Sequence, residues 1–504
     1  MMGRSRQNLG RVLGRRAVLG GMVSAVAGTA LANAPVRSLR PVARSGPIDP
    51  ATHIAPEVML LDAALSGTVA FMLADAETGE VLEANAEQIA QPPASVAKAV
   101  TALYALDQLG AEHRFETQVI ATGGFADGVC LGDLVLVGSG DPTLDTDAME
   151  SVARDLKAVG LREVRGEFQI YEDALPYVAT IDAQQPDYLG YSPSVSGLNL
   201  NFNRVHFEWR RAGADYSVTM DARSEKHRPD VAMARMRVER RETPVYAYSD
   251  GGHFDQWSVA RSALGNAGAR WLPVRKPGLY AADVLRTFAR AQGIALGTAS
   301  VTRARPEGAV LARFLSGTMT EQMRGMLKFS TNLTAEAAGL AASQRTGAID
   351  GLSASASLMN RWCKAELGID ATFVDHSGLG DQSRISAEQM VAALVRVGPN
   401  GNLRPILKDI DMTDEDRKRI GDHPVQVAAK TGTLNFVSAL AGYIRAVDGR
   451  MLAFAFFAAD VERRAAISRS DREDPSGARS YNRRAKRLQQ RLLQRWGALY
   501  TVDV

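Results

Sequence analysis

The stretch Pro93-Ala94-Ser95-Val96-Ala97-Lys98 places a serine three residues before a lysine at the start of a predicted helix. Successive helical residues advance by about 100°, so Ser95 and Lys98 lie on nearly the same face, about one turn apart. A serine hydroxyl is a weak nucleophile until a nearby base removes its proton. Lys98 can act as that base only if its pKa falls by about 3 units from about 10.4, which costs about 4 kcal/mol. Burial and neighbouring cations can supply such a shift, although Ser-x-x-Lys alone also fits a helix start with a surface lysine.

The segments before this helix indicate an antiparallel sheet. Thr68–Asp75 reads as an apolar strand, Glu77-Thr78-Gly79 as a turn and Glu80–Asn85 as a returning strand, which together predict a hairpin. The helix that carries Ser95 follows directly. Strand, turn, strand and helix predict an α/β (α+β) fold in which the helix packs against an antiparallel sheet.

Two further motifs lie downstream. Ser330-Thr331-Asn332 interrupts a helical region over Glu321–Ala342, and Lys430-Thr431-Gly432-Thr433 lies on a predicted strand over Val425–Thr433. Each motif is weak alone, because Ser-x-Asn occurs again at residues 480–482. In combination they are demanding: a helical Ser-x-x-Lys, then Ser-x-Asn between helices, then Lys-Thr-Gly on a strand.

These residue types fit acyl transfer through a serine. Ser95 attacks a carbonyl while Lys98 takes its proton. The tetrahedral oxyanion needs backbone donors, and the N–H groups of Ser95 and Thr433 are suitably placed if the strand passes the helix start. Ser330 can pass a proton to the leaving amine, with Lys430 beside it keeping the local field positive.

The remaining motif residues fit substrate binding. Asn332 can donate a hydrogen bond to a backbone carbonyl of the substrate and orient Lys98. Thr431 and Thr433 can hydrogen-bond a terminal carboxylate beside Lys430. A peptide that ends in D-Ala-D-Ala satisfies all of these groups.

With these motifs the chain resembles the penicillin-recognising serine enzymes. Within them it is similar to the low-molecular-mass class C penicillin-binding proteins, the D-alanyl-D-alanine carboxypeptidase/endopeptidases. The resemblance covers about residues 55–500 and includes a long interval between Ser95 and Ser330 and the phrases at 138–144, 198–203 and 375–379. Two positions depart from the family pattern: Thr331 stands where relatives often carry Asp, and His376 stands where glycine is usual.

The resemblance implies a β-lactamase/transpeptidase-like catalytic domain, an antiparallel sheet flanked by helices, with a large, mostly β insertion. It implies a serine DD-peptidase that acts on peptidoglycan stem peptides, is inhibited by β-lactam antibiotics and needs no cofactor. Ser95, Lys98, Ser330, Asn332 and Lys430 are its expected catalytic residues, and Thr431, Gly432 and Thr433 its expected substrate-binding residues.

The predicted organisation has five segments. They are an export signal at 1–32, a linker at 33–50, a first catalytic part at 51–112, inserted and mostly β domains at 113–300, and a second catalytic part at 301–504. The expected strands of the insertion are short, and turn clusters such as residues 138–142 separate them. A helix is expected over Ala281–Gln292, where the chain returns to the catalytic part.

The N-terminal segment predicts export. Arginines precede a short, weakly apolar run over Ala17–Ala32, and Ala30-Leu31-Ala32 fits a cleavage site. Arg15-Arg16 also resembles a twin-arginine signal, with a general secretory signal as the alternative. We therefore expect a periplasmic or other extracytoplasmic protein.

Charge and hydrophobic pattern limit the partners. The net charge of +3 is too small to indicate nucleic-acid binding. The basic helix predicted over Gly477–Leu499 has an apolar stripe that should pack on the sheet, so membrane association is at most peripheral. Cys130 and Cys363 are the two cysteines, and we expect two separate buried thiols.

Rival enzyme classes lack required parts. Gly-x-Ser-x-Gly is absent, which argues against an α/β-hydrolase, and the seven histidines show no His-Glu-x-x-His zinc spacing. The adjacent Asp375 and His376 are expected to structure a loop rather than to form a catalytic triad. A class A β-lactamase would carry Glu-x-x-Leu-Asn between Ser330 and Lys430, and Glu336 and Glu366 read as helix-surface or structural acids. The alternatives left open are a non-catalytic wall-binding or scaffolding protein and a β-lactamase.

Overall fold

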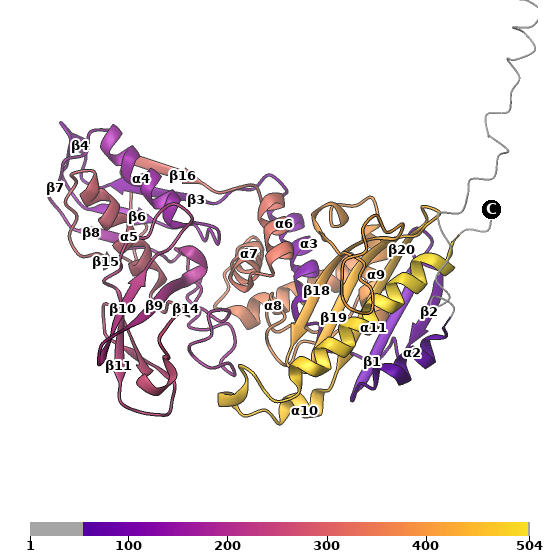
Figure 1. Ribbon diagram of the computed structural model, residues 1–504. Coiled ribbons are helices and arrows are strands. Elements are labelled where there is room, and N and C mark those ends of the chain that lie inside the picture. Colours follow the sequence, from indigo (N-terminus) through magenta and orange to yellow (C-terminus); the bar gives the residue numbers. More distant parts are fainter. Residues whose placement is uncertain (1–53, 502–504) are drawn as a thin grey trace, which may run out of the picture. The chain divides into compact units, whose positions relative to one another are not determined.

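The computed structural model describes residues 54–501, and its largest sheet joins segments from both ends of that range (Figure 1). The six strands lie in the order β17-β18-β19-β20-β1-β2 and every neighbouring pair is antiparallel. Their bounds are β1 Thr68–Asp75, β2 Val81–Asn85, β17 Lys408–Asp409, β18 Gln426–Leu434, β19 Val437–Arg445 and β20 Met451–Ala459. The predicted hairpin is β1–β2, and β1 closes the sheet by pairing with β20 over its whole length.

Helices cover both faces of this sheet because its central strands are apolar on both sides. Ala441 and Tyr443 of β19 belong to the core that contains the Ser95 helix, whereas Leu440 and Ile444 belong to the core on the other face. The first core includes α3 Ala97–Leu109, α6 Met319–Phe329, α7 Asn332–Gln344, α8 Leu352–Trp362 and α9 Ala387–Val397. The second includes α2 Pro56–Ala63 and α11 Ala478–Leu499.

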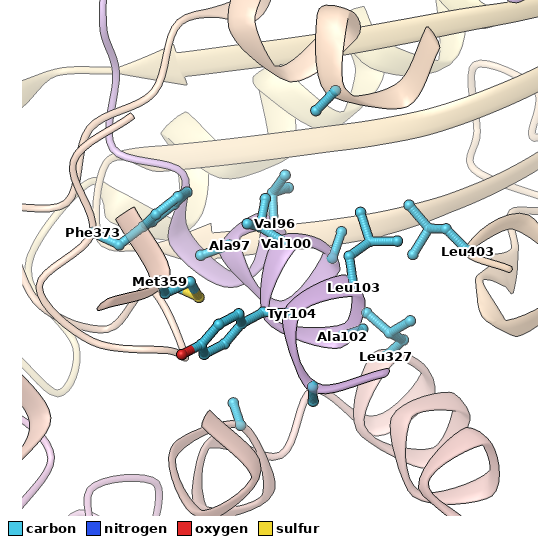
Figure 2. Packing of buried hydrophobic residues seen from close by; sticks show 14 of the residues in the cluster. Val96, Ala97, Val100, Ala102, Leu103, Tyr104, Leu327, Met359, Phe373 and Leu403 are labelled. Atoms are coloured by element: carbon cyan, nitrogen blue, oxygen red, sulfur yellow. The ribbon is translucent and has the colours of Figure 1, made fainter. Parts of the chain in front are cut away.

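The helix α3 is the centre of the first core. Every residue from Ala97 to Leu106 is buried, because α6, α7 and α8 enclose this helix. Figure 2 shows Tyr104 of α3 beside Met359 of α8, and Leu103 close to Leu403. This enclosure keeps water from the helix that carries Lys98.

The apolar stripe of α11 packs as predicted. Leu488, Leu492 and Trp496 are at most 1% exposed and contact the sheet core, where the Trp496 ring lies 5.6 Å from that of Phe71. Among residues 54–501 no helix is both long and apolar enough to cross a membrane.

A third core, separate from the two that flank the six-stranded sheet, lies in the segment between α3 and α6. Its main sheet has the order β15-β8-β6-β3-β16, and three three-stranded sheets accompany it. The bounds are β3 Glu116–Ala121, β4 Phe125–Ala126, β5 Val129–Cys130, β6 Leu134–Val137, β7 Glu163–Val164, β8 Phe168–Tyr171, β9 Arg204–Ala212, β10 Asp215–Asp221, β11 Ala234–Glu239, β12 Tyr246–Asp250, β13 Asp255–Ala260, β14 Ala267–Pro273, β15 Ser300–Val301 and β16 Ala309–Leu315. Two helices, α4 Thr146–Ala158 and α5 Pro277–Ala291, pack in the same core.

The strands between residues 113 and 300 form sheets of their own, and none of them joins the sheet that carries Lys430. The five-stranded sheet also includes β16, which lies beyond the boundary expected at residue 300. The division at 113 and 300 stays a prediction. The predicted export signal and the whole of the predicted linker lie outside the described residues.

Two details differ from or extend the sequence analysis. Helix α4 was not predicted, although Asp145 caps it and Ala148, Met149, Val152 and Leu156 are buried at helical spacing. The two cysteines are buried, unpaired thiols in different cores, as predicted.

Candidate active site

Ser95 lies in a tight turn that leads into α3. Residues Ala94–Val96 form a short 3-10 helix, and Ala94 has a left-handed φ of 46°. Two glycines allow other segments to approach this turn closely. A Cβ on Gly378 would lie 1.9 Å from the carbonyl oxygen of Ala94, and one on Gly432 would lie 2.9 Å from that of Pro93. Gly432 is therefore needed where β18 passes beside the turn that presents Ser95.

Lys98 is fully buried and its Nζ is surrounded by three oxygens. Ser95 Oγ lies at 3.0 Å, Asn332 Oδ1 at 2.7 Å and the Ser377 carbonyl oxygen at 2.8 Å. A carbonyl oxygen only accepts hydrogen bonds, so a neutral amine donates its two N–H groups to Asn332 and Ser377. The lone pair then faces the Ser95 hydroxyl, which is the geometry that proton removal requires.

The surroundings of Lys98 favour its neutral form. Burial lowers the pKa of Lys98 to about 8, while the charges of Glu336 and Asp375 oppose that shift. The free amine is therefore populated near neutral pH, as the sequence analysis requires of a base.

Ser330 and Lys430 form a second polar pair. Ser330 ends α6 in a left-handed conformation with φ 60°, and this break separates α6 from α7 as expected. Lys430 Nζ donates to Ser330 Oγ at 3.0 Å and to the Thr431 carbonyl at 2.7 Å. Burial, helped by the charges of Lys98 and Lys408, lowers the pKa of Lys430 to about 7. In the free site the neutral form of Lys430 is therefore populated near neutral pH, whereas the sequence analysis expected this lysine to stay positive.

The β18 segment beyond Ala429 has an open edge. Strand β17 pairs only with Ala428 and Ala429, while β19 follows β18 on its other side as far as Leu434. Thr431 and Thr433 are exposed, and Gly432 between them is buried. This edge can accept an extended peptide.

Asn332 connects the inserted segment to the site. Its Oδ1 accepts from Lys98, and its Nδ2 donates to the backbone carbonyl of Tyr191 at 2.8 Å. Tyr191 belongs to the long connection between β8 and β9. The sequence analysis did not predict this contact, because no local sequence pattern indicates which distant loop contacts the site.

His376 has a structural role rather than a place in a triad. Its Nε2 lies 2.7 Å from Ser355 Oγ and its Nδ1 3.3 Å from Met359 Sδ. Burial lowers the pKa of His376 to about 3, so the ring is neutral. A Cβ on Gly339 would lie 2.2 Å from this ring, so the small residue on α7 makes room for it. The predicted loop-structuring role fits these contacts.

The acids considered between Ser330 and Lys430 separate into two environments. Glu366 is exposed, as a helix-surface acid should be. Glu336 is 0% exposed, so the surface alternative is wrong for it, and its oxygens accept the backbone N–H groups of His376 and Ser377. Helix α7 is enclosed on nearly every side, which periodicity alone did not reveal.

Two D-alanyl-D-alanine carboxypeptidases are similar to this chain over most of its length. The chain is 27% identical over 431 residues to a D-alanyl-D-alanine carboxypeptidase of Actinomadura sp., covering 78% of each protein. It is 22% identical over 395 residues to the D-alanyl-D-alanine carboxypeptidase DacB of Haemophilus influenzae, covering 72% of this chain and 79% of the relative.

Solved structures show the same fold. Penicillin binding protein 4 from Haemophilus influenzae superposes with a TM-score of 0.67 at 18% identity, covering 83% of this chain and 98% of that one. A second structure of that protein, in complex with a β-lactam, gives a TM-score of 0.64. The predicted β-lactamase/transpeptidase-like fold with a sheet-rich insertion is thereby confirmed.

A family model described as the D-Ala-D-Ala carboxypeptidase 3 (S13) family matches residues 54–475, a range that includes all three motifs. The chain belongs to this family of D-Ala-D-Ala carboxypeptidases, and the prediction of a serine DD-peptidase is confirmed.

Proposed function

We propose that this DD-peptidase works through an acyl-enzyme on Ser95 with Lys98 as its general base. The observation that carries the proposal is the arrangement of three oxygens around Lys98 Nζ: Asn332 Oδ1 and the Ser377 carbonyl accept its two N–H groups, and its lone pair faces the hydroxyl of Ser95. The Ser95 proton passes to Lys98 as Oγ bonds to the substrate carbonyl. The N–H groups of Ser95 and Thr433 stabilise the oxyanion.

Collapse of the tetrahedral intermediate needs a proton on the leaving amine. The hydroxyl of Ser330, which lies 3.0 Å from Lys430 Nζ, delivers it, and the proton that Lys98 took from Ser95 replaces the one that Ser330 gives up. Asn332 Oδ1 holds Lys98 in place by accepting its hydrogen bond. Asn332 Nδ2 donates to a backbone carbonyl of the substrate, which replaces the Tyr191 carbonyl. Gly432 lets β18 approach Ser95, and the substrate pairs along this edge.

A terminal carboxylate binds beside Lys430, Thr431 and Thr433. The carboxylate stabilises the ammonium form of Lys430, and repulsion between two nearby ammonium groups then lowers the pKa of Lys98. Binding of the correct substrate thus favours a charged Lys430 and a neutral Lys98, which is the protonation state that acylation needs. This coupling favours substrates with a carboxylate, including peptidoglycan stem peptides and β-lactams.

The proposed coupling has a consequence for pH dependence. The acylation rate constant at saturating substrate should rise with pH, because Lys98 accepts a proton only when it is neutral. For an uncharged ester the midpoint should lie near the Lys98 pKa of about 8, and for a carboxylate-bearing analogue it should lie lower. Stopped-flow acylation over a pH series measures both midpoints. Equal midpoints would contradict the coupling.

Labelling with a fluorescent penicillin tests the proposed function against the non-catalytic alternative. The wild-type protein should be labelled covalently and the Ser95→Ala variant should not. Release of D-Ala from a stem peptide identifies carboxypeptidase activity, and cleavage of a cross-linked dimer identifies endopeptidase activity. A wild-type protein that takes up no label and cleaves neither substrate would support a wall-binding role.

We propose that the protein acts in the periplasm after export through the twin-arginine pathway. The motive is Arg15-Arg16 ahead of the short apolar run. Replacing both arginines by lysine should leave the protein in the cytoplasmic fraction. Unchanged export of that variant would favour the general secretory route.

A further inference from the structure

Two buried carboxyl groups, those of Glu336 and Asp375, interact with Lys98 through their charges. Glu336 is on α7, one turn after Asn332, so helical geometry brings both side chains to the same face. Asp375 lies in the loop that follows the short helix η5 (Cys363–Leu367) and is 2% exposed. The roles proposed above for the motif residues use neither group. A buried charge is costly unless it is hydrogen-bonded and paired, so both positions need a physical reason.

Glu336 is connected to Lys98 through a single residue. Its Oε1 accepts the Ser377 N–H at 2.9 Å, and the carbonyl of Ser377 accepts from Lys98 Nζ at 2.8 Å. Its Oε2 accepts the His376 N–H, also at 2.9 Å. The carboxylate thus holds the two peptide units that precede the Ser377 carbonyl, and that carbonyl oxygen is one of the two acceptors of the neutral base.

The same loop is tied down at two other points. Asp375 accepts the N–H groups of Gly378 and Gly380 at 2.7 and 2.6 Å, which closes the loop on itself. Thr101 of α3 donates to the His376 carbonyl at 2.6 Å. Of these contacts, the one from Thr101 positions the loop without adding charge, which makes it a useful control.

The charged groups around Lys98 come from several different elements. Lys98 lies on α3 and Lys430 on β18, while the carboxyl groups are Glu336 on α7, Asp375 in the loop and Asp182 from the inserted segment. His376 is neutral. Burial raises the pKa of Glu336, and Asp375 adds to that shift, while the charge of Lys98 opposes it. Attraction between unlike charges in a water-poor interior is strong, so the charges of Glu336 and Lys98 depend on each other.

We propose that Glu336 is a positioning residue for Lys98. Its carboxylate holds the Ser377 carbonyl against Nζ and supplies the negative charge that stabilises the ammonium formed when Lys98 takes the Ser95 proton. Glu336 itself exchanges no proton in that step and touches no substrate. The inference rests on the proposed role of Lys98 as general base.

The test is the pH profile of kcat/KM for an uncharged ester, which reports the pKa of the base in the free enzyme. Glu336→Gln removes the charge with little change in size. The rising limb should then move to lower pH by about one unit, because the ammonium form of Lys98 loses its nearest counter-charge. The plateau should also fall, because a weaker base removes the proton less readily.

Thr101→Val is the matched control. It removes a hydrogen bond to the same loop without changing charge. The plateau value of kcat/KM should therefore fall, while the rising limb of the pH profile stays at the wild-type pH. If the limb of Glu336→Gln also stays in place, Glu336 only braces the loop and the proposal is wrong. A limb that moves to higher pH contradicts it as well.

Glu336→Asp keeps the charge and covers the case in which the glutamine variant does not fold. Its limb should stay near the wild-type position although its plateau falls. A limb displaced by about a unit, as if the charge were lost, would contradict the proposal. If Lys98→Ala acylates as fast as the wild type, the proposed general base itself is wrong, and that result is distinct from an unmoved limb.

Discussion

Replacing Lys98 by alanine should lower the rate constant for acylation of Ser95 by about 10²–10⁴-fold toward every substrate, which is the usual contribution of general base catalysis. The expectation follows from the geometry, since Lys98 Nζ is the basic group 3.0 Å from Ser95 Oγ and is fully buried. Stopped-flow measurement with a fluorescent penicillin and with an uncharged ester gives the rate constants. A loss of less than tenfold with both reagents would exclude Lys98 as the base.

Lys430→Ala is the matched variant, because it removes the second buried lysine of the same site. Its effect should fall mainly on binding of carboxylate-bearing substrates, since Lys430 supplies charge attraction rather than proton removal. The ratio of kcat/KM for a carboxylate substrate to that for an uncharged ester should fall by at least about tenfold, or about 1.4 kcal/mol. Equal losses toward both substrates in both variants would show that this division of roles is wrong.

Gly339→Ala should lower the free energy of unfolding by about 1–3 kcal/mol, the range for overpacking a well-filled core. The added Cβ would lie 2.2 Å from the His376 ring, which is fully buried and stacks on Tyr104. The ring has little freedom to move, because Ser355 and Met359 hold its two nitrogens. Denaturant unfolding of the variant measures this loss.

The double variant Gly339→Ala/His376→Gly tests the same contact by rescue. Removing the ring leaves space for the new methyl group, so the loss in the double variant should be at least about 1 kcal/mol smaller than the sum of the two single losses. Additive losses would show that Gly339 and His376 are independent. Rescue would show that the small residue at position 339 is needed because it makes room for the His376 ring.

The sequence predicted best those elements whose own residues determine them. The strand β1 was predicted with the bounds that the structure has, and β18 begins and ends within one residue of its predicted bounds, because apolar runs bounded by turn residues such as Glu77-Thr78-Gly79 leave little choice. The three motifs were also sufficient to indicate that Ser95, Lys98, Ser330, Asn332 and Lys430 would meet. The structure places these side chains in two hydrogen-bonded groups, with Ser95, Lys98 and Asn332 in one and Ser330 and Lys430 in the other.

What the sequence did not predict depends on tertiary packing. Helix α4 has a clear N-cap at Asp145, but the surrounding short strands masked its periodicity. The Tyr191 carbonyl reaches Asn332 from the connection between β8 and β9, 141 positions away in the sequence, and no spacing rule predicts such a contact. The pKa shifts of Lys98 and Lys430 depend on burial and on the charges that surround each side chain, and a linear motif reports neither.

Deacylation is the step that separates a penicillin-inhibited peptidase from a β-lactamase. After penicillin opens on Ser95, the ring remains attached and blocks the leaving-group side, so hydrolysis needs a water activated elsewhere. A class A β-lactamase uses a dedicated glutamate for this purpose. Here both oxygens of Glu336 are occupied by backbone N–H groups, and Glu366 is an exposed acid on η5 (Cys363–Leu367). Neither is arranged to activate a water at the ester.

Intact-mass spectrometry after treatment with penicillin tests the central claim of a Ser95 acyl-enzyme most directly. The account predicts a stoichiometric adduct with the mass of intact penicillin, long-lived after excess drug is removed, that peptide mapping assigns to the peptide containing Ser95. The Ser95→Ala variant should show no adduct. Rapid, repeated hydrolysis of penicillin with no surviving adduct, or an adduct on a different residue, would contradict it.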